Sequence, residues 1–270
     1  MNQQHNIPVV MAFSGNDPTG GAGIQADIEA IASMGCHCAP IITALTVQNT
    51  EGVIRFEATA SSLVIEQARA VLEDMPVAAI KIGMIGSIEN AQAIHTLLSD
   101  YPNIPVVLDP VLAGGGGGSL SEQNMAEAIC ELLLPLVTIT TPNSDEARIL
   151  APLADNLDAC AQELLDGGCQ YALITGTHEN TQHIDNRFYS IHRHLETFTW
   201  DRLAGSYHGS GCTLASAIAG LLAQGLEAFA AVHEGQEYAW ESLQQGYRAG
   251  MGQLLPNRLF WARNNEDEPE

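Results

Sequence analysis

The sequence predicts an α/β fold, in which a mostly parallel central sheet is covered by helices on both faces and carries a small hairpin at one edge. Short apolar runs alternate along the chain with longer segments of helical periodicity. The short runs are apolar nearly throughout, which is typical of strands buried on both faces of a parallel sheet. Late in the chain, two β-prone runs follow each other without a helical segment between them, and this change indicates a hairpin.

Each strand-like run is followed within two residues by Gly, Pro or Asn, which favour turns. The predicted strands are residues 9–14, 40–47, 78–84, 106–112, 137–141 and 171–175. The segments between them place apolar residues at helical spacing. The predicted helices are residues 22–34, 62–73, 88–98, 122–133, 145–151, 157–165 and 213–222. The hairpin is expected at 186–191 and 195–200, and a further long helical segment at 235–254.

The length and composition favour one large domain. A chain of 270 residues with 46% hydrophobic residues can bury a sizeable core. Neither a repeat nor a linker is evident, so we expect a single domain over residues 1–263. The polar, acidic tail at 264–270 is expected to be disordered.

The charge excludes several classes of partner. Ten basic and 32 acidic residues give a formal net charge of −22, which argues against nucleic acid or an anionic membrane as partner. A phosphorylated substrate is still compatible, because helix N-termini and a metal ion can supply local positive potential. Lys81 is the only lysine.

Neither a signal peptide nor an apolar run of about 18 residues is present, and the six cysteines are mostly scattered. We therefore expect a cytoplasmic protein with reduced thiols. The run Cys36-His37-Cys38 could bind a metal, but metal sites usually need a second matched pair. Small residues entering a buried strand are the favoured interpretation.

Polar and glycine residues gather where the predicted strands end. Because ligands bind at the carboxyl ends of the strands in open parallel sheets, these residues predict a site at that edge. They are Gly15-Asn16-Asp17, Gln48-Asn49, Asp109-Pro110, Thr141-Pro142-Asn143 and Gly176-Thr177-His178.

A glycine-rich turn follows the first strand, from Gly15 to Asp27. It lacks the Gly-Lys-Ser/Thr of a Walker A loop, and its glycines are not spaced as in a dinucleotide fingerprint. A plain strand-to-helix turn is the alternative to a ligand site here.

Asp109 ends one strand, and Asn143 and Glu146 begin the helix after the next one. Carboxylates and amides at such positions suit Mg²⁺, although Glu146 would also be favourable simply as an acid in the first turn of a helix. Five glycines, 114–118, follow soon after Asp109; they could form a flap over a nucleotide or a loose connection.

The segment His208 to Leu214 carries the most specific signal. Gly209, Ser210 and Gly211 run into an apolar helix whose first backbone N–H groups can bind an anion. Cys212 lies in the first turn, where the field of the helix favours a thiolate. Together these features predict phosphoryl transfer to a hydroxyl; a small buried cysteine at a helix start is the alternative.

Taken together, the motifs resemble the ribokinase superfamily, and within it the hydroxymethylpyrimidine/phosphomethylpyrimidine kinases of thiamine biosynthesis. The resemblance runs from about residue 9 to 222, in order and with matching spacing. Other sugar kinases of the superfamily have aspartate where this chain has Cys212. The matching segments are residues 15–27, 42–50, 81–84, 108–111, 141–147 and 208–214.

The resemblance implies a ribokinase-like fold and a cytoplasmic homodimer. It also implies that, with Mg²⁺, the γ-phosphate of ATP is transferred to an aminopyrimidine alcohol and then to its monophosphate. Cys212 would be the general base, and the N–H groups of Gly209, Ser210, Gly211 and Cys212 would hold the transferring phosphoryl group. The other roles implied are Asp27 and Gln48 on the aminopyrimidine; Gly15, Met84 and Val111 lining its pocket; and Asp109, Asn143 and Glu146 serving magnesium and the phosphates.

The chain departs from the family pattern at two places. Thr175-Gly176-Thr177-His178 replaces the common Lys-Gly-Gly-His, and Ala113 with five glycines replaces Ala-Lys-Ser-Gly. Two basic residues near the phosphates are thus absent, which predicts slow transfer to the anionic monophosphate. The alternatives are a pyridoxal kinase, a non-catalytic binder of a vitamin precursor, and thiol hydrolysis by Cys212 with His208 as its base.

Overall fold

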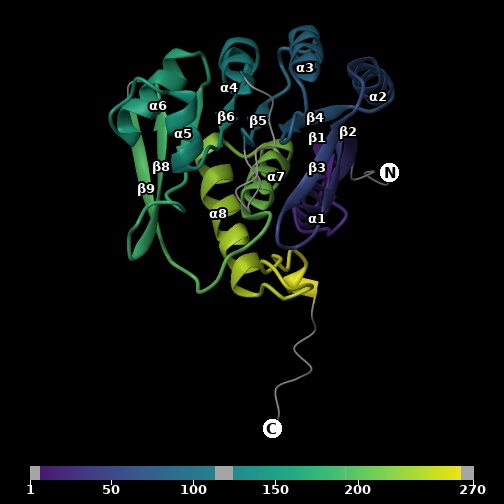
Figure 1. Ribbon diagram of the computed structural model, residues 1–270. Helices are drawn as coiled ribbons and strands as arrows, with labels where there is room; N and C mark the ends of the chain where they lie inside the picture. The colour runs from purple at the N-terminus through teal and green to yellow at the C-terminus, as the bar shows by residue number, and fades with distance from the viewer. Residues whose placement is uncertain (1–6, 113–123, 192, 263–270) are drawn as a thin grey trace, which may run out of the picture.

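The computed structural model describes residues 7–112, 124–191 and 193–262. The glycine run at 114–118, a possible flap, lies outside these residues. The tail at 264–270, which is expected to be disordered, also lies outside them. The α/β fold is confirmed, because the described strands form one nine-stranded sheet flanked by helices (Figure 1).

The sheet has the order β3-β2-β1-β4-β5-β6-β7-β8-β9. The pairings from β2 through β7 are parallel, whereas β3 pairs antiparallel with β2, and β8 and β9 extend the far edge antiparallel. The bounds are β1 Val9–Asn16, β2 His37–Gln48, β3 Val53–Ala58, β4 Val77–Ile82, β5 Val106–Leu108, β6 Ile139–Thr140, β7 Tyr171–Ile174, β8 His183–Ser190 and β9 Arg193–Asp201.

Helices cover both faces, as predicted. One face carries α2, α3, α4, α5 and α6, and the other carries α1, α7 and α8; Figure 1 shows α2, α3 and α4 in a row opposite α7 and α8. The bounds are α1 Gly23–Ser33, α2 Ser61–Asp74, α3 Ile88–Asp100, α4 Met125–Ala128, α5 Ser144–Leu150, α6 Leu157–Asp166, α7 Ser210–Ala223 and α8 Ala228–Gln244.

Two apolar cores lie between these layers. The core under α2 to α6 includes Phe13 and Ile82, and the core under α1, α7 and α8 includes Val10 and Ile218, all almost completely buried. Successive residues of a strand point to opposite faces, so the continuously apolar strands supply both cores at once. No helix among the described residues has the length and apolar character that a membrane span requires.

The hairpin at the edge is confirmed as β8 and β9. The opposite edge strand, β3, was not predicted. Its exposed residues include Arg55 and Glu57, and an edge strand of this kind lacks the apolar run that reveals a buried strand.

The long helix predicted at 235–254 is wrong in its bounds. Helix α8 begins at Ala228 and ends at Gln244, and the chain beyond it is irregular. That segment instead bonds to two loops: the Gln253 N–H donates to Thr50 O (2.8 Å), and the His208 N–H donates to Leu254 O (2.9 Å). Glycines 246, 250 and 252 weaken a helix here, and Gly250 and Gly252 allow the close approach to Thr50.

Cys36 is buried and lies with its sulfur 3.3 Å from Gly220 O, while Cys38 is half-buried. Among the described residues, no group of three or more potential ligands could hold a metal ion. Strand β2 begins at His37, so Cys36-His37-Cys38 enters a strand, as the favoured interpretation predicts.

Candidate active site

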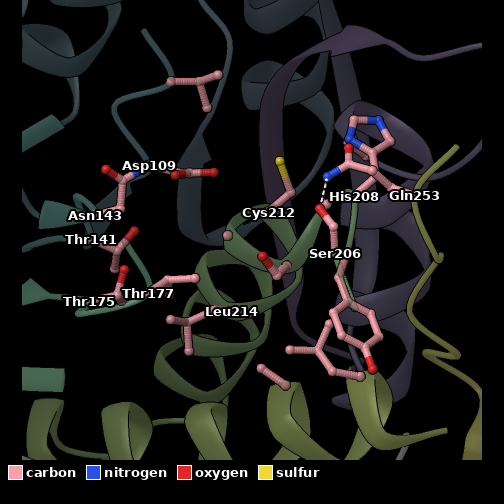
Figure 2. Close-up of a pocket in the computed structure, with 18 of the residues that line it drawn as sticks. Asp109, Thr141, Asn143, Thr175, Thr177, Ser206, His208, Cys212, Leu214 and Gln253 are labelled. Carbon is pink, nitrogen blue, oxygen red and sulfur yellow. Dashed lines mark hydrogen bonds between the residues drawn. The ribbon is translucent and has the colours of Figure 1, made fainter. Parts of the chain in front are cut away.

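A cavity of about 500 Å³ opens at the carboxyl ends of the parallel strands. Figure 2 shows Asp109, Asn143 and Thr175 on one side of it, His208 on the other, and Cys212 between them. All but one of the residues to which the family resemblance gives a role line this cavity; the exception is Asp27. The lining ones are Gly15, Gln48, Met84, Val111, Asp109, Asn143, Glu146, Gly209, Ser210, Gly211 and Cys212.

The start of α7 is built from glycine. Gly209 precedes the helix in the left-handed conformation, with φ 85°, and a Cβ atom there would overlap Gly21 O of the first glycine turn. The two glycine segments therefore pack backbone against backbone, which only glycine permits. The first residues of this 14-residue helix line the cavity, where their N–H groups can bind an anion.

Asp109 faces that helix start. A Cβ atom on Gly211 would lie 3.6 Å from Asp109 Oδ1, and Asp109 lies close enough to the Cys212 thiol for their charges to affect each other. Strand β5 ends at Leu108 instead of residue 112, because Pro110 has no N–H for the ladder. The early end turns Asp109 into the cavity.

The expected lowering of the Cys212 pKa is wrong. Burial raises the pKa of this thiol to about 12; Lys81 nearby lowers it, and the neighbouring carboxylate of Asp109 raises it. Cys212 is therefore a neutral thiol beside a carboxylate.

Asp27 lies apart from the cavity, contrary to its expected place on the aminopyrimidine. Its side chain is fully buried and forms an ion pair of 2.8 Å with Lys81 Nζ, which is also fully buried. The Ser216 hydroxyl donates to the same oxygen, Asp27 Oδ1, at 2.7 Å. Asp27 is thus the counter-ion of Lys81, beneath the floor of the site.

Lys81 places a positive charge near Cys212 and Asp109. No role at the site was predicted for it, because it lies inside strand β4. Burial opposes its charge, but Asp27, Cys212 and Asp109 together hold the pKa of Lys81 above its usual value. A Cβ atom on Gly83 would come within 2.5 Å of its ammonium nitrogen, so glycine leaves room for this group.

Asp109 and Glu146 form a pair of buried carboxylates. Burial raises the pKa of both, and Asp109 contributes to a Glu146 pKa of about 8. Asp109 Oδ2 is buried without a hydrogen-bond partner. Two clustered carboxylates, one with an unsatisfied oxygen, suit Mg²⁺, which keeps several waters and needs few protein ligands.

Asn143 has a local role as well. Its side-chain oxygen accepts from the backbone of Asp145 (3.0 Å) and Glu146 (2.9 Å), and Glu146 Oε2 accepts from the Asn143 N–H (2.9 Å). This capping box starts α5 and fixes Glu146 at the cavity wall.

Two further basic side chains were not predicted at the site. Arg202 lines the cavity and donates to the carbonyls of Thr177, Glu179 and Thr181. The cavity therefore has a positive charge in its wall, although the chain has Thr175 where the family commonly has lysine. Arg258 is 2% exposed and donates to Thr213 Oγ1 and to Gly21 O, tying the two glycine segments together. Both arginines come from outside the motif segments, so no local pattern marks them.

A model of the phosphomethylpyrimidine kinase family matches residues 17–257. The chain belongs to the phosphomethylpyrimidine kinase family. A hydroxymethylpyrimidine/phosphomethylpyrimidine kinase of Synechococcus elongatus is 35% identical over 252 residues, covering 92% of this chain and 95% of that one. The sequence motifs between residues 15 and 214 therefore predicted the family correctly.

Solved structures agree with this family membership. The phosphomethylpyrimidine kinase of Clostridium difficile is 33% identical, with a TM-score of 0.76 over 88% of this chain and 99% of that one. A pyridoxal kinase of Staphylococcus aureus in complex with AMP-PCP has a TM-score of 0.86 over 95% of both chains, at 24% identity. The latter likeness concerns the fold alone, which is the ribokinase-like fold expected for this family.

Proposed function

We propose that this member of the phosphomethylpyrimidine kinase family transfers the γ-phosphoryl group of ATP to the hydroxymethyl group of 4-amino-5-hydroxymethyl-2-methylpyrimidine, and then to the resulting monophosphate, in thiamine biosynthesis. The observation that carries the proposal is the start of α7, where open N–H groups and Cys212 face Asp109 across one cavity. Phosphoryl transfer depends mainly on positioning and on stabilisation of charge, and this arrangement can supply both.

The acceptor alcohol would lie between Gly15, Gln48, Met84 and Val111. A Cβ atom on Gly15 would come within 2.8 Å of Met84 Sδ, so glycine keeps this wall open to a flat ring. Met84 and Val111 belong to a small apolar cluster, and Gln48 supplies an amide. An apolar slot with few polar groups is typical of sites for small heterocycles.

The N–H groups of Gly209, Ser210, Gly211 and Cys212 would hold the transferring phosphoryl group. Asp109 and Glu146 would hold Mg²⁺, which when bound neutralises charge on the phosphate oxygens. The family resemblance also supports a cytoplasmic homodimer that acts on small molecules.

Cys212 would take the proton from the acceptor hydroxyl. Because burial keeps its sulfur a neutral thiol close to the Asp109 carboxylate, we propose a relay. The hydroxyl proton moves to Cys212 Sγ as the thiol passes its own proton to Asp109. The hydroxyl oxygen forms its bond to the γ-phosphorus while the bond from that phosphorus to the oxygen bridging to the β-phosphate breaks, and ADP leaves with the electron pair of the broken bond. A relay of this kind requires no free thiolate before the transfer begins.

A coupled ATP-turnover assay with the purified protein tests this function. The pyrimidine alcohol and its monophosphate should both stimulate ADP formation, and pyridoxal should do so less. Binding of the alcohol by calorimetry without any ATP turnover would instead support a non-catalytic binder.

Glu146→Gln is expected to lower kcat/KM by about 10²–10³, the usual cost of removing one charge-stabilising group. Glutamine keeps the acceptor that caps α5, and it removes the repulsion between two buried carboxylates, so the melting temperature should not fall. Steady-state kinetics over a series of Mg²⁺ concentrations and thermal unfolding measure both effects. Asp145→Asn, on the same helix but 65% exposed, is the matched control; equal kinetics for the two variants would contradict the role of Glu146.

Thr175→Lys is expected to speed transfer to the monophosphate more than transfer to the alcohol. Thr175 lines the cavity at the end of β7, and an ammonium there would attract the anionic acceptor by roughly 0.5–1 kcal/mol, or about 2–5-fold in kcat/KM. Thr96→Lys adds the same charge on an exposed position of α3 and should change neither step. If Thr175→Lys behaves like Thr96→Lys, the lack of a positive charge at this wall is not what slows the second transfer.

A further inference from the structure

Three polar side chains form a hydrogen-bonded chain in the wall of the cavity. His208 Nε2 lies 2.9 Å from Asp17 Oδ2 and 2.7 Å from the side-chain nitrogen of Gln48. Asp17 and His208 are 6% and 8% exposed, whereas Gln48 is half-buried. All three residues line the cavity, so the chain runs from a buried carboxylate to an amide at the acceptor slot.

The carboxylate at the buried end is an anion. Asp17 accepts hydrogen bonds from the N–H groups of Thr19 (2.8 Å) and Ala22 (2.9 Å), and from the Thr19 hydroxyl. Burial alone would raise its pKa, but these bonds and the contact with His208 lower it below its usual value. A fully bonded carboxylate of this kind demands a donor from each neighbour.

His208 must therefore carry a proton on Nε2. A bare ring nitrogen would set its lone pair against an anionic oxygen at 2.9 Å, which is repulsive. The ring has little freedom to turn away, because a Cβ atom on Gly21 would already lie 2.5 Å from His208 Cδ2. The Nε2–H group can thus donate to both Asp17 and Gln48 only as one shared, three-centre hydrogen bond.

The protonated Nε2 decides the orientation of the Gln48 amide. If the atom of Gln48 that lies 2.7 Å from His208 Nε2 were its side-chain nitrogen, two N–H donors would face each other. The two ends of an amide have nearly the same shape, so the hydrogen-bond network decides which end is which. With the amide turned by 180°, its oxygen accepts from His208, and its NH₂ group becomes the end left for the cavity.

We infer that Asp17 and His208 hold Gln48 with its NH₂ group toward the cavity, so that position 48 donates to an acceptor atom of the substrate, such as an unprotonated ring nitrogen of a flat heterocycle. His208 and Asp17 are positioning residues for this contact. A glutamine side chain can either donate or accept a hydrogen bond, and the inference states that Gln48 donates to the substrate. The identity of the heterocycle rests on the proposed function; the orientation of the amide does not.

Gln48→Glu tests the polarity. At pH 8 the new carboxylate can still accept from His208, but it presents an anionic acceptor to the cavity in place of a donor. We expect KM for the pyrimidine alcohol to rise about 10–100-fold, the cost of leaving a buried acceptor unpaired, with kcat changed much less. If an oxygen of Gln48 instead accepts from the substrate amine, the carboxylate will preserve or improve KM, and that result would overturn the inference.

Gln67→Glu, at a half-buried position of α2 that does not line the cavity, is the matched control for added charge and should leave KM unchanged. Thermal unfolding of both variants separates a loss of contact from a loss of fold.

The tautomer of His208 can be measured without any substrate. Nitrogen-15 NMR of the histidine-labelled protein, with the His208 signals assigned by their loss in His208→Gln, should show a proton on Nε2. An Nε2 without a proton would overturn the inference, whatever the protein phosphorylates. Conversely, a protein that shows this tautomer but no pyrimidine turnover would contradict only the proposed function.

Discussion

Replacing Cys212 by alanine is expected to lower kcat by about 10²–10⁴, the range for losing a group that moves a proton in the transition state. KM for the pyrimidine alcohol should change little, because the thiol contributes to the transfer more than to binding. Cys212→Ser should keep more activity than the alanine variant, since a hydroxyl can also pass a proton to Asp109. Steady-state kinetics of the three proteins measures these effects.

Cys130→Ala is the matched control, because Cys130 is also half-buried but does not line the cavity. It should retain wild-type kcat. Near-normal turnover in Cys212→Ala would remove Cys212 from the proton path. A serine variant as slow as the alanine variant would argue against the relay while leaving Cys212 at the site.

Lys81→Met is expected to lower the free energy of unfolding by about 3–5 kcal/mol, because it leaves the Asp27 carboxylate buried without its cation. The double variant Lys81→Met/Asp27→Asn should recover most of this loss, since the isolated charge is then removed as well. Urea unfolding of the single and double variants measures the coupling between the two residues.

Arg69→Met provides the control. Arg69 also forms a 2.8 Å ion pair, with Asp100, but the two side chains are 42% and 48% exposed, so its loss should cost no more than about 1 kcal/mol. If Lys81→Met costs no more than Arg69→Met, the buried pair is not the structural element described here.

The sequence predicted the parallel sheet, its hairpin edge and the location of the site, because each depends on local patterns. Apolar runs mark buried strands, and the residues after them meet at one edge of the sheet. The start of α7 was predictable for the same reason, since Gly209 to Cys212 are adjacent in the chain.

The electrostatics of the site could not be predicted in this way. The pairing of Lys81 with Asp27 joins residues 54 positions apart, and their burial is a property of the packed core. The same burial reverses the expected pKa of Cys212. Arg258 reaches the glycine turn across 237 positions, from a segment beyond the predicted helix at 235–254 for which no structure was predicted.

The most direct test of the proposed function is phosphorus-31 NMR of the products formed from ATP, Mg²⁺ and the pyrimidine alcohol. We predict that a new phosphate monoester appears first and accumulates, and that a diphosphate signal replaces it more slowly. Both signals should be absent or greatly delayed with Cys212→Ala. Formation of ADP and inorganic phosphate without a new ester, or an ester only when pyridoxal is the acceptor, would contradict the proposed function.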